Sequence, residues 1–83
     1  MKRRIEWRSR ALKEAQRLDV ALRERIADAV ERLSDDKVSV QRLEGYKPPL
    51  FRIRVGDWRI LFTIEAGVTT IQRVLPRDKA YRQ

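Results

Sequence analysis

The chain has 83 residues, which is enough for one domain spanning residues 1–83 and for a single hydrophobic core. Its 20 lysines and arginines outnumber 12 acidic residues, so the formal net charge is +8. This charge favours an anionic partner such as nucleic acid, although a charged surface that serves only solubility would look similar. The absence of cysteine and histidine excludes disulfides, thiolate chemistry and metal sites built on those residues. No stretch approaches the roughly 20 apolar residues that span a bilayer, so we expect a soluble, cytoplasmic protein without a membrane partner.

The first elements follow from apolar spacing. Residues 3–8 alternate, which predicts a short strand with Ile5 and Trp7 on one face. Ser9 is the predicted N-cap of a following helix, because its hydroxyl can accept from an early backbone N–H. The apolar residues at helical spacing in this first helix are Ala11, Leu12, Ala15 and Leu18.

A second, longer helix is predicted after Asp19, its expected cap. Its apolar stripe consists of Leu22, Ile26, Val30 and Leu33. Charges of both signs occupy the opposite face, which is typical of a solvated surface. The helix is expected to end at residues 34–37, and the stretch from there to Leu50 has no sustained period and is interpreted as a connection. Tyr46 and Lys47 lie in it, either as tethers or near a nucleic-acid surface.

Two strands joined by a tight turn are predicted over residues 51–64. Apolar and basic residues alternate up to Val55, and a second run resumes at Trp58. Gly56-Asp57 suits a two-residue hairpin turn because glycine adopts positive φ at little cost. This register pairs Val55 with Trp58, and it divides the side chains between two faces. The apolar face carries Phe51, Ile53, Val55, Trp58, Ile60 and Phe62.

The other face of this hairpin carries Arg52, Arg54 and Arg59 beside Leu61. Guanidinium groups gathered on one side repel one another unless an anion or an acidic partner joins them. This is therefore a candidate anion site, and arginines that are simply solvated on an exposed sheet face are the alternative.

A last strand is predicted from Val68 to Leu75, after a turn at residues 66–67. A two-residue loop would place Arg73 opposite Ile60 on the core side, whereas a loop one residue longer would place it opposite Leu61. The cost of burying an unpaired charge favours the second register. Pro76 ends the strand because it has no N–H to donate.

The order of elements resembles the RelE/ParE superfamily of toxin–antitoxin toxins over nearly the whole chain. The residues that carry the resemblance are Ile5-Glu-Trp7, Leu43-Glu-Gly45, the run Phe51-Arg-Ile-Arg-Val-Gly-Asp-Trp-Arg59 and the basic ending Pro76-Arg-Asp-Lys-Ala-Tyr81. The resemblance implies an α+β fold with an N-terminal strand, a two-helix hairpin and a three-stranded antiparallel meander. These strands form one sheet with the helices on one face.

The RelE branch, as the resemblance implies, cleaves messenger RNA in the ribosomal A site through attack by the RNA's own 2′-hydroxyl. Neither a metal nor an organic cofactor is then expected. The catalytic residues carried over by position are Arg52, Arg54, Arg59, Arg77 and Tyr81. Further RNA contacts are expected from Lys47, Arg73, Lys79 and Arg82.

The ribonuclease branch has lysine where this chain has Arg52 and Arg54. Arginine stays protonated and is a poor general base, so Tyr81 or a ribosomal group would accept the proton. The expected partners are messenger RNA, the ribosome and an acidic antitoxin, with which the chain would form a hetero-oligomer. The alternatives are a ParE-like toxin that binds DNA gyrase without catalysis, and a plain RNA-binding module.

Overall fold

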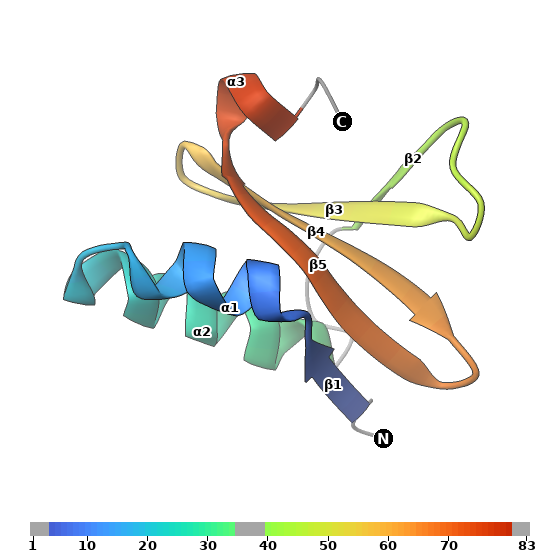
Figure 1. The fold of residues 1–83 in the computed structure, drawn as a ribbon, viewed down its shortest axis with the longest axis horizontal. Coiled ribbons are helices and arrows are strands. Elements are labelled where there is room, and N and C mark those ends of the chain that lie inside the picture. The colour runs from blue at the N-terminus through green and yellow to red at the C-terminus, as the bar shows by residue number, and fades with distance from the viewer. Residues whose placement is uncertain (1–3, 35–39, 81–83) are drawn as a thin grey trace.

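Two helices lie against one side of a five-stranded sheet, and a short third helix lies on the other side (Figure 1). The computed structural model describes residues 4–34 and 40–80, with residues 79 and 80 as backbone only. The elements in chain order are β1 (Arg4–Trp7), α1 (Ser9–Gln16), α2 (Val20–Ser34), β2 (Gln41–Leu43), β3 (Leu50–Val55), β4 (Trp58–Glu65), β5 (Val68–Pro76) and α3 (Arg77–Ala80).

The sheet has the strand order β1-β5-β4-β3-β2 and is mixed. The β3–β4–β5 meander is antiparallel as predicted, whereas β1 pairs with β5 in parallel. The interpretation of the stretch before Leu50 as a connection throughout is wrong, because residues 41–43 form β2 on the free edge of β3. Three residues are too few for a period to emerge, and the strand is defined by its partner rather than by its own pattern.

The two helices begin in different ways. Asp19 caps α2 as predicted, since its Oδ1 accepts from the Leu22 N–H at 2.8 Å. The prediction for Ser9 is wrong, because the N-cap of α1 is Arg8 and no side chain caps it. The Arg8 N–H donates to Ile71 O at 3.0 Å, which keeps Arg8 extended and makes Ser9 the first helical residue.

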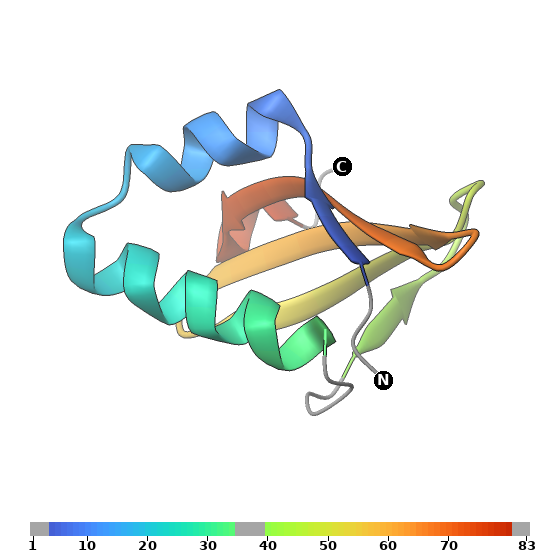
Figure 2. The same cartoon turned by 90° about the horizontal axis from the view of Figure 1, so that it is seen from below.

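The core lies between the helix pair and the apolar face of the sheet (Figure 2). Ile26, Val30 and Leu33 of α2 are buried there, and Leu22 packs against them, as the spacing predicted. All six apolar residues of the predicted hairpin face belong to this cluster, and the Phe51 and Phe62 rings stack at 5.7 Å. A smaller cluster on the opposite face consists of Leu61 and Leu75 with Leu43 and Leu50 packed against them.

We expect Ile26→Ala to lower the free energy of unfolding by about 2–5 kcal/mol, because the change removes buried methyl groups and leaves a cavity. Ile26 is 1% exposed, whereas Leu12 on α1 is 45% exposed and serves as the matched control. Leu12→Ala should change stability much less. Chemical denaturation followed by circular dichroism measures both variants, and equal losses would contradict this packing.

Candidate functional site

The candidate site is built on the β3–β4 hairpin, whose register is as predicted. Val55 pairs with Trp58, and Arg54 pairs with Arg59. Gly56 has a φ of +59°, a conformation that glycine adopts without strain and that other residues rarely adopt, so the turn favours glycine. Cross-strand partners share a face, and the turn therefore holds the arginines of both strands on the side away from α1 and α2.

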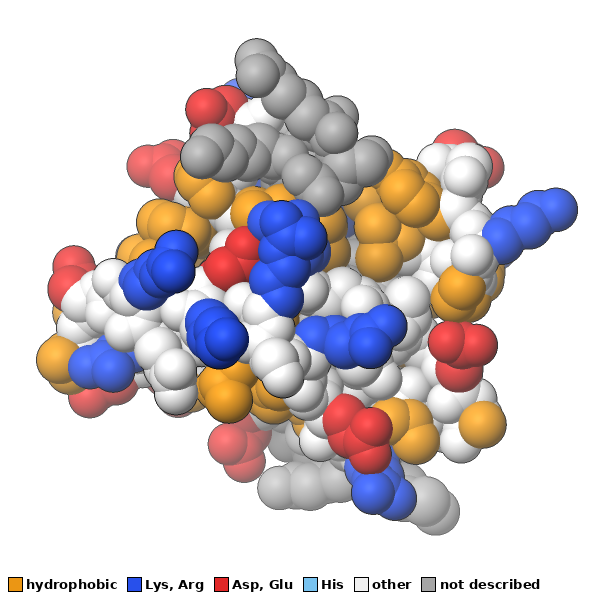
Figure 3. Space-filling view, viewed as in Figure 1, with side chains coloured by type: hydrophobic (Ala, Val, Ile, Leu, Met, Phe, Trp, Pro, Cys, Tyr) orange, Lys and Arg blue, Asp and Glu red, His pale blue; other side chains and the backbone are white. Residues whose placement is uncertain are grey.

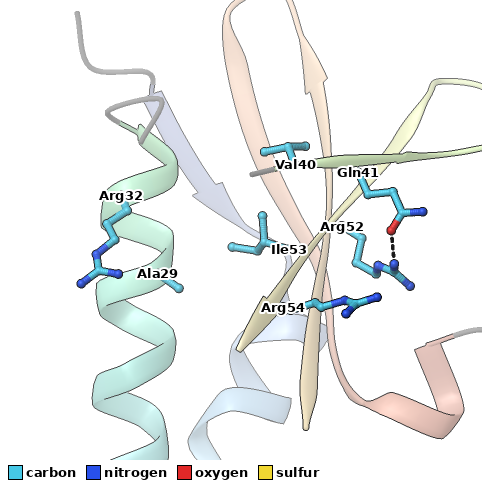
Figure 4. Close-up of a pocket in the computed structure, with 7 residues that line it drawn as sticks. All are labelled: Ala29, Arg32, Val40, Gln41, Arg52, Ile53 and Arg54. Atoms are coloured by element: carbon cyan, nitrogen blue, oxygen red, sulfur yellow. Dashed lines mark hydrogen bonds between the residues drawn. The ribbon is translucent and has the colours of Figure 1, made fainter. Parts of the chain in front are cut away.

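Arg52 is held in place by the edge strand β2. Its side chain is 3% exposed, and its Nη2 donates to Oε1 of Gln41, which lies opposite it in the β2–β3 register. Figure 4 shows this bond, with Arg52 and Arg54 extending to one side of β3 and Ile53 to the other. Sequence analysis missed Gln41, because its partner is set by strand pairing and nothing in its own segment signals a strand.

Arg59 is also buried, at 4% exposure, so for this residue the alternative of an arginine simply solvated on an exposed sheet face is wrong. Its Nη1 donates to Gly56 O at 3.0 Å and to Trp58 O at 2.9 Å. The guanidinium therefore ties together two carbonyl groups of the turn, one on each side of Asp57. Arg59 is a structural part of the turn as well as a positive charge beside Arg54.

Arg54 is the exposed member of this set. With Arg52, Ile53 and Val40 it lines a groove of about 500 Å³ between β3 and α2, where Arg32 and Ala29 form the opposite wall (Figure 4). The apolar lining of the groove is Ala29, Val40 and Ile53, while the guanidinium groups of Arg52 and Arg54 extend to the side of β3 that faces away from α2 (Figure 4). Arg32 is one of the charged residues opposite the apolar stripe of α2, a face that the helical spacing predicted to be simply solvated.

The Arg77 segment comes back to the same hairpin turn. Arg77 N donates to Asp57 O at 2.8 Å, which attaches the start of α3 to the turn, and the Arg77 side chain is exposed. The structure therefore brings Arg52, Arg54, Arg59 and the Arg77 backbone to one region. The predicted residues Tyr81 and Arg82 lie outside the described residues, as does the side chain of Lys79.

The register of β5 combines a two-residue turn with a position for Arg73 on the face away from the core. The turn has two residues, since Glu65 pairs with Val68, yet Arg73 lies opposite Leu61 as preferred. A β-bulge reconciles these facts, because Phe62 pairs with Ile71 and Gln72 is left out of the pairing. No local pattern signals such an insertion.

Arg73 is engaged by α1 rather than presented to solvent. Its guanidinium forms an ion pair with Glu14, with Nη2 2.7 Å from Oε2, and Glu14 Oε1 accepts from Val74 N at 2.9 Å. Glu14 thus binds the edge of β5 where β1 has already ended. Sequence analysis missed this residue, because 59 positions separate it from Arg73.

The charge state of Glu14 follows from these contacts. Burial opposes the charged form and by itself raises the pKa. Hydrogen bonds from Arg73 and from Val74 N–H, with the positive charges of Arg73 and Arg10, outweigh burial and hold the pKa of Glu14 below its ordinary value of 4.5. The carboxylate is therefore a stabilising anion at neutral pH.

Lys47, the remaining predicted contact, is exposed and lies apart from the arginines, beside Tyr46 and Leu50 at the other end of β3. Across residues 4–34 and 40–80, no group of three or more acidic, histidine or cysteine side chains is placed to hold a metal ion. None of the helices in these ranges is long and apolar enough to cross a membrane.

Solved structures share this architecture. The chain superposes on a chain of the archaeal RelE–RelB complex from Pyrococcus horikoshii with a TM-score of 0.76 and 27% identity, over 93% of this chain and 97% of that one. For the toxin–antitoxin complex RelBE2 from Mycobacterium tuberculosis the TM-score is 0.80 at 20% identity, covering 93% and 100% of the two chains. For the RelB–RelE complex from Methanococcus jannaschii it is 0.75 at 23% identity, covering 93% and 95%. The last two similarities establish the fold alone.

The fold is therefore RelE-like. Residues 5–81 match the family described as the ParE toxin of the type II toxin–antitoxin system parDE, and the chain belongs to this family within the RelE/ParE superfamily. A comparison with curated protein sequences gives no match. These findings confirm the resemblance on which the sequence analysis relied.

We expect Glu14→Gln to lower the thermal midpoint at neutral pH, with a difference from the wild type that shrinks in acid. The pKa of Glu14 is lower in the folded state, so its stabilisation is complete above the unfolded value near 4.5 and is lost as pH falls through the folded value. Thermal unfolding at neutral pH and at about pH 3 measures the difference. Glu24→Gln, on the exposed face of α2, is the control. A difference in thermal midpoint for Glu14→Gln that did not vary with pH would contradict the lowered pKa of Glu14.

Proposed function

We propose that this toxin is a ribosome-dependent endoribonuclease that cleaves messenger RNA in the A site. The observation that carries the proposal is the arrangement of Arg52, Arg54 and Arg59 on one face of a rigid hairpin, with the Arg77 segment bonded to its turn. Positive charge gathered at one place is what a phosphate requires when it acquires additional negative charge in a transition state. The resemblance to the ribonuclease branch supplies the reaction.

In the proposed reaction, a ribose 2′-oxygen attacks the adjacent phosphorus, and the bond from phosphorus to the 5′-oxygen breaks. The products are a 2′,3′-cyclic phosphate and a 5′-hydroxyl end. A base removes the proton of the 2′-hydroxyl, and an acid delivers a proton to the departing 5′-oxygen. The chain's own contribution is to position the phosphate and to stabilise its charge.

The arginines divide this work according to their exposure. Arg54 and Arg77 are exposed, and each can present a planar guanidinium to phosphate oxygens. Arg52 and Arg59 are held by Gln41 and by the turn carbonyls, so they contribute fixed positive charge beside Arg54. Because arginine retains its proton, we assign the proton transfers to Tyr81 or to a ribosomal group.

The second candidate is a toxin that binds DNA gyrase and performs no catalysis. The match of residues 5–81 to the ParE toxin family favours it, as does the structural engagement of Arg52 and Arg59. The two candidates predict different cellular outcomes. An endoribonuclease stops translation and leaves cleaved transcripts, whereas a gyrase inhibitor causes a DNA damage response while translation continues.

We expect Arg54→Ala and Arg77→Ala each to reduce transcript cleavage on ribosomes with an empty A site by about 100- to 1000-fold, the usual effect of removing one positioned donor at a developing charge. Both side chains are exposed, so thermal midpoints should stay close to the wild type. Arg23→Ala on the outer face of α2 removes the same charge elsewhere and should cleave normally. Wild-type protein that arrests growth without cleaving transcripts would support the gyrase candidate.

We further propose that an acidic antitoxin occupies the groove between α2 and β3. Its apolar part (Ala29, Val40 and Ile53) is bordered by Arg32, Arg52 and Arg54. β2 pairs only with Leu50–Arg52, and within the described ranges no strand pairs with residues 53–55 of β3 on that side. An extended segment could add there as a strand while its acidic side chains meet the arginines.

We expect Arg32→Glu to weaken antitoxin binding by about ten- to a hundredfold, because the reversed charge repels acidic residues in the groove. Arg23→Glu is the matched control, since nine residues, or about two and a half helical turns, place it on the opposite side of α2. Isothermal titration calorimetry with the cognate antitoxin measures both variants. Equal affinities for the two variants would place the antitoxin elsewhere.

A further inference from the structure

A second pocket opens at the other end of the hairpin strands. It has a volume of about 340 Å³ and is lined by residues from four separate parts of the chain, among them Arg8, Tyr46, Lys47, Thr63 and Gln72. Neither the catalytic set nor the antitoxin groove includes it, apart from Lys47 as a general RNA contact. It therefore requires an explanation of its own.

This pocket lies on the same face of the sheet as the arginines. Leu50 and Thr63 line it and pair with each other across β3 and β4. They lie four residues from the Arg54–Arg59 pair, and residues at even spacing along a strand share a face. At 3.4 Å per residue the two positions are about 14 Å apart. One single-stranded ligand that follows the strands can therefore reach both.

The β-bulge in β5 gives the pocket an ordered polar floor. Gln72, the residue left out of the pairing, donates through Nε2 to Thr63 Oγ1 at 3.1 Å, and its Oε1 accepts from Arg8 Nε at 3.1 Å. These two bonds fix the orientation of the amide and anchor the Arg8 guanidinium. Bulges commonly redirect a side chain next to a functional site, and here the redirected side chain lies under the pocket.

The walls of the pocket suit a nucleotide. Tyr46 provides a half-buried aromatic ring, while Arg8 and Lys47 provide two positive charges against the single carboxylate of Glu65. Single-stranded RNA is recognised through bases that stack on aromatic rings or guanidinium planes and form hydrogen bonds along their edges. A peptide rich in acidic groups would make less use of the aromatic ring and of the amide–hydroxyl floor.

We propose that this pocket binds a nucleotide of single-stranded RNA that flanks the one held by the arginines, with its base against Tyr46 and its polar groups at Arg8. This inference rests on the proposed action on RNA. It makes Tyr46 and Arg8 specificity-determining residues, because they contact a nucleotide other than the one that is cleaved. Gln72 is a positioning residue that acts through Arg8.

The test is binding of a short, fluorescein-labelled, 2′-O-methylated single-stranded RNA to the full chain, measured by fluorescence anisotropy. The methyl groups remove the attacking hydroxyl, so binding is measured without cleavage. We expect Tyr46→Leu to weaken binding about tenfold through lost stacking, with little change in its salt dependence. Tyr46→Phe keeps the ring and should bind like the wild type, and Arg8→Gln should weaken binding and also reduce the salt dependence.

The controls separate this proposal from the ribonuclease proposal. Lys13→Ala, a charge loss on the exposed side of α1, should change affinity less than Arg8→Gln, and thermal midpoints verify that each variant is folded. Wild-type protein that cleaves transcripts while folded Tyr46→Leu binds RNA normally would overturn the pocket and leave the ribonuclease function intact. Tyr46-dependent RNA binding without cleavage would support the pocket and reject the ribonuclease. A loss of antitoxin affinity in Tyr46→Leu with unchanged RNA binding would assign the pocket to the antitoxin.

Discussion

The two-residue turn at Gly56–Asp57 is the constraint on which this molecule depends. It fixes the β3–β4 register, and since side chains alternate along a strand, it decides which residues meet the helices and which do not. A slip by one residue would turn the arginines toward α2 and expose the apolar set. The turn is itself reinforced by Arg59, which donates to its carbonyl groups.

A consequence of this register is that charged side chains must be accommodated on a face that is not fully open to water. Burying a guanidinium costs free energy unless acceptors replace the lost water. Gln41 serves Arg52 and the turn carbonyls serve Arg59, whereas Arg54 stays exposed. The arginines of this face are therefore of two kinds, those that hold the fold and those that can meet a ligand. Figure 3 shows that further lysine and arginine side chains gather over α1 and β5.

The last strand links the helices to this face. β1 pairs with β5 only as far as Ile71, and beyond it Glu14 of α1 accepts the Val74 N–H while Pro76 has no N–H to offer on that edge. The bulge at Gln72 turns one side chain toward Thr63 and brings Arg73 to Glu14. Contacts between α1 and β5 thus fix the path of the chain up to Arg77, where α3 meets the hairpin turn.

Much of the fold could be predicted from the sequence, because apolar spacing, cap residues and turn residues act within a few positions of one another. Both helices, the Asp19 cap, the hairpin register and the apolar face follow from spacing within a few residues, and the resemblance to RelE/ParE toxins rests on the same hairpin. The strand β2 could not be predicted, since three residues carry no period and only pairing with β3 defines them. Ser9 was misassigned because a contact between Arg8 and Ile71, far apart in the chain, sets where α1 begins.

The candidate site also has features that could be predicted from the sequence and features that could not. The sequence by itself determined that Arg52, Arg54 and Arg59 share a face, because alternation and a tight turn leave no other arrangement. Only the tertiary structure decided which of them are buried, that Glu14 engages Arg73, and that Tyr46, Thr63 and Gln72 surround one pocket. These outcomes depend on hydrogen-bond partners from distant segments, and a pattern within one segment carries no information about which distant side chain will supply the partner.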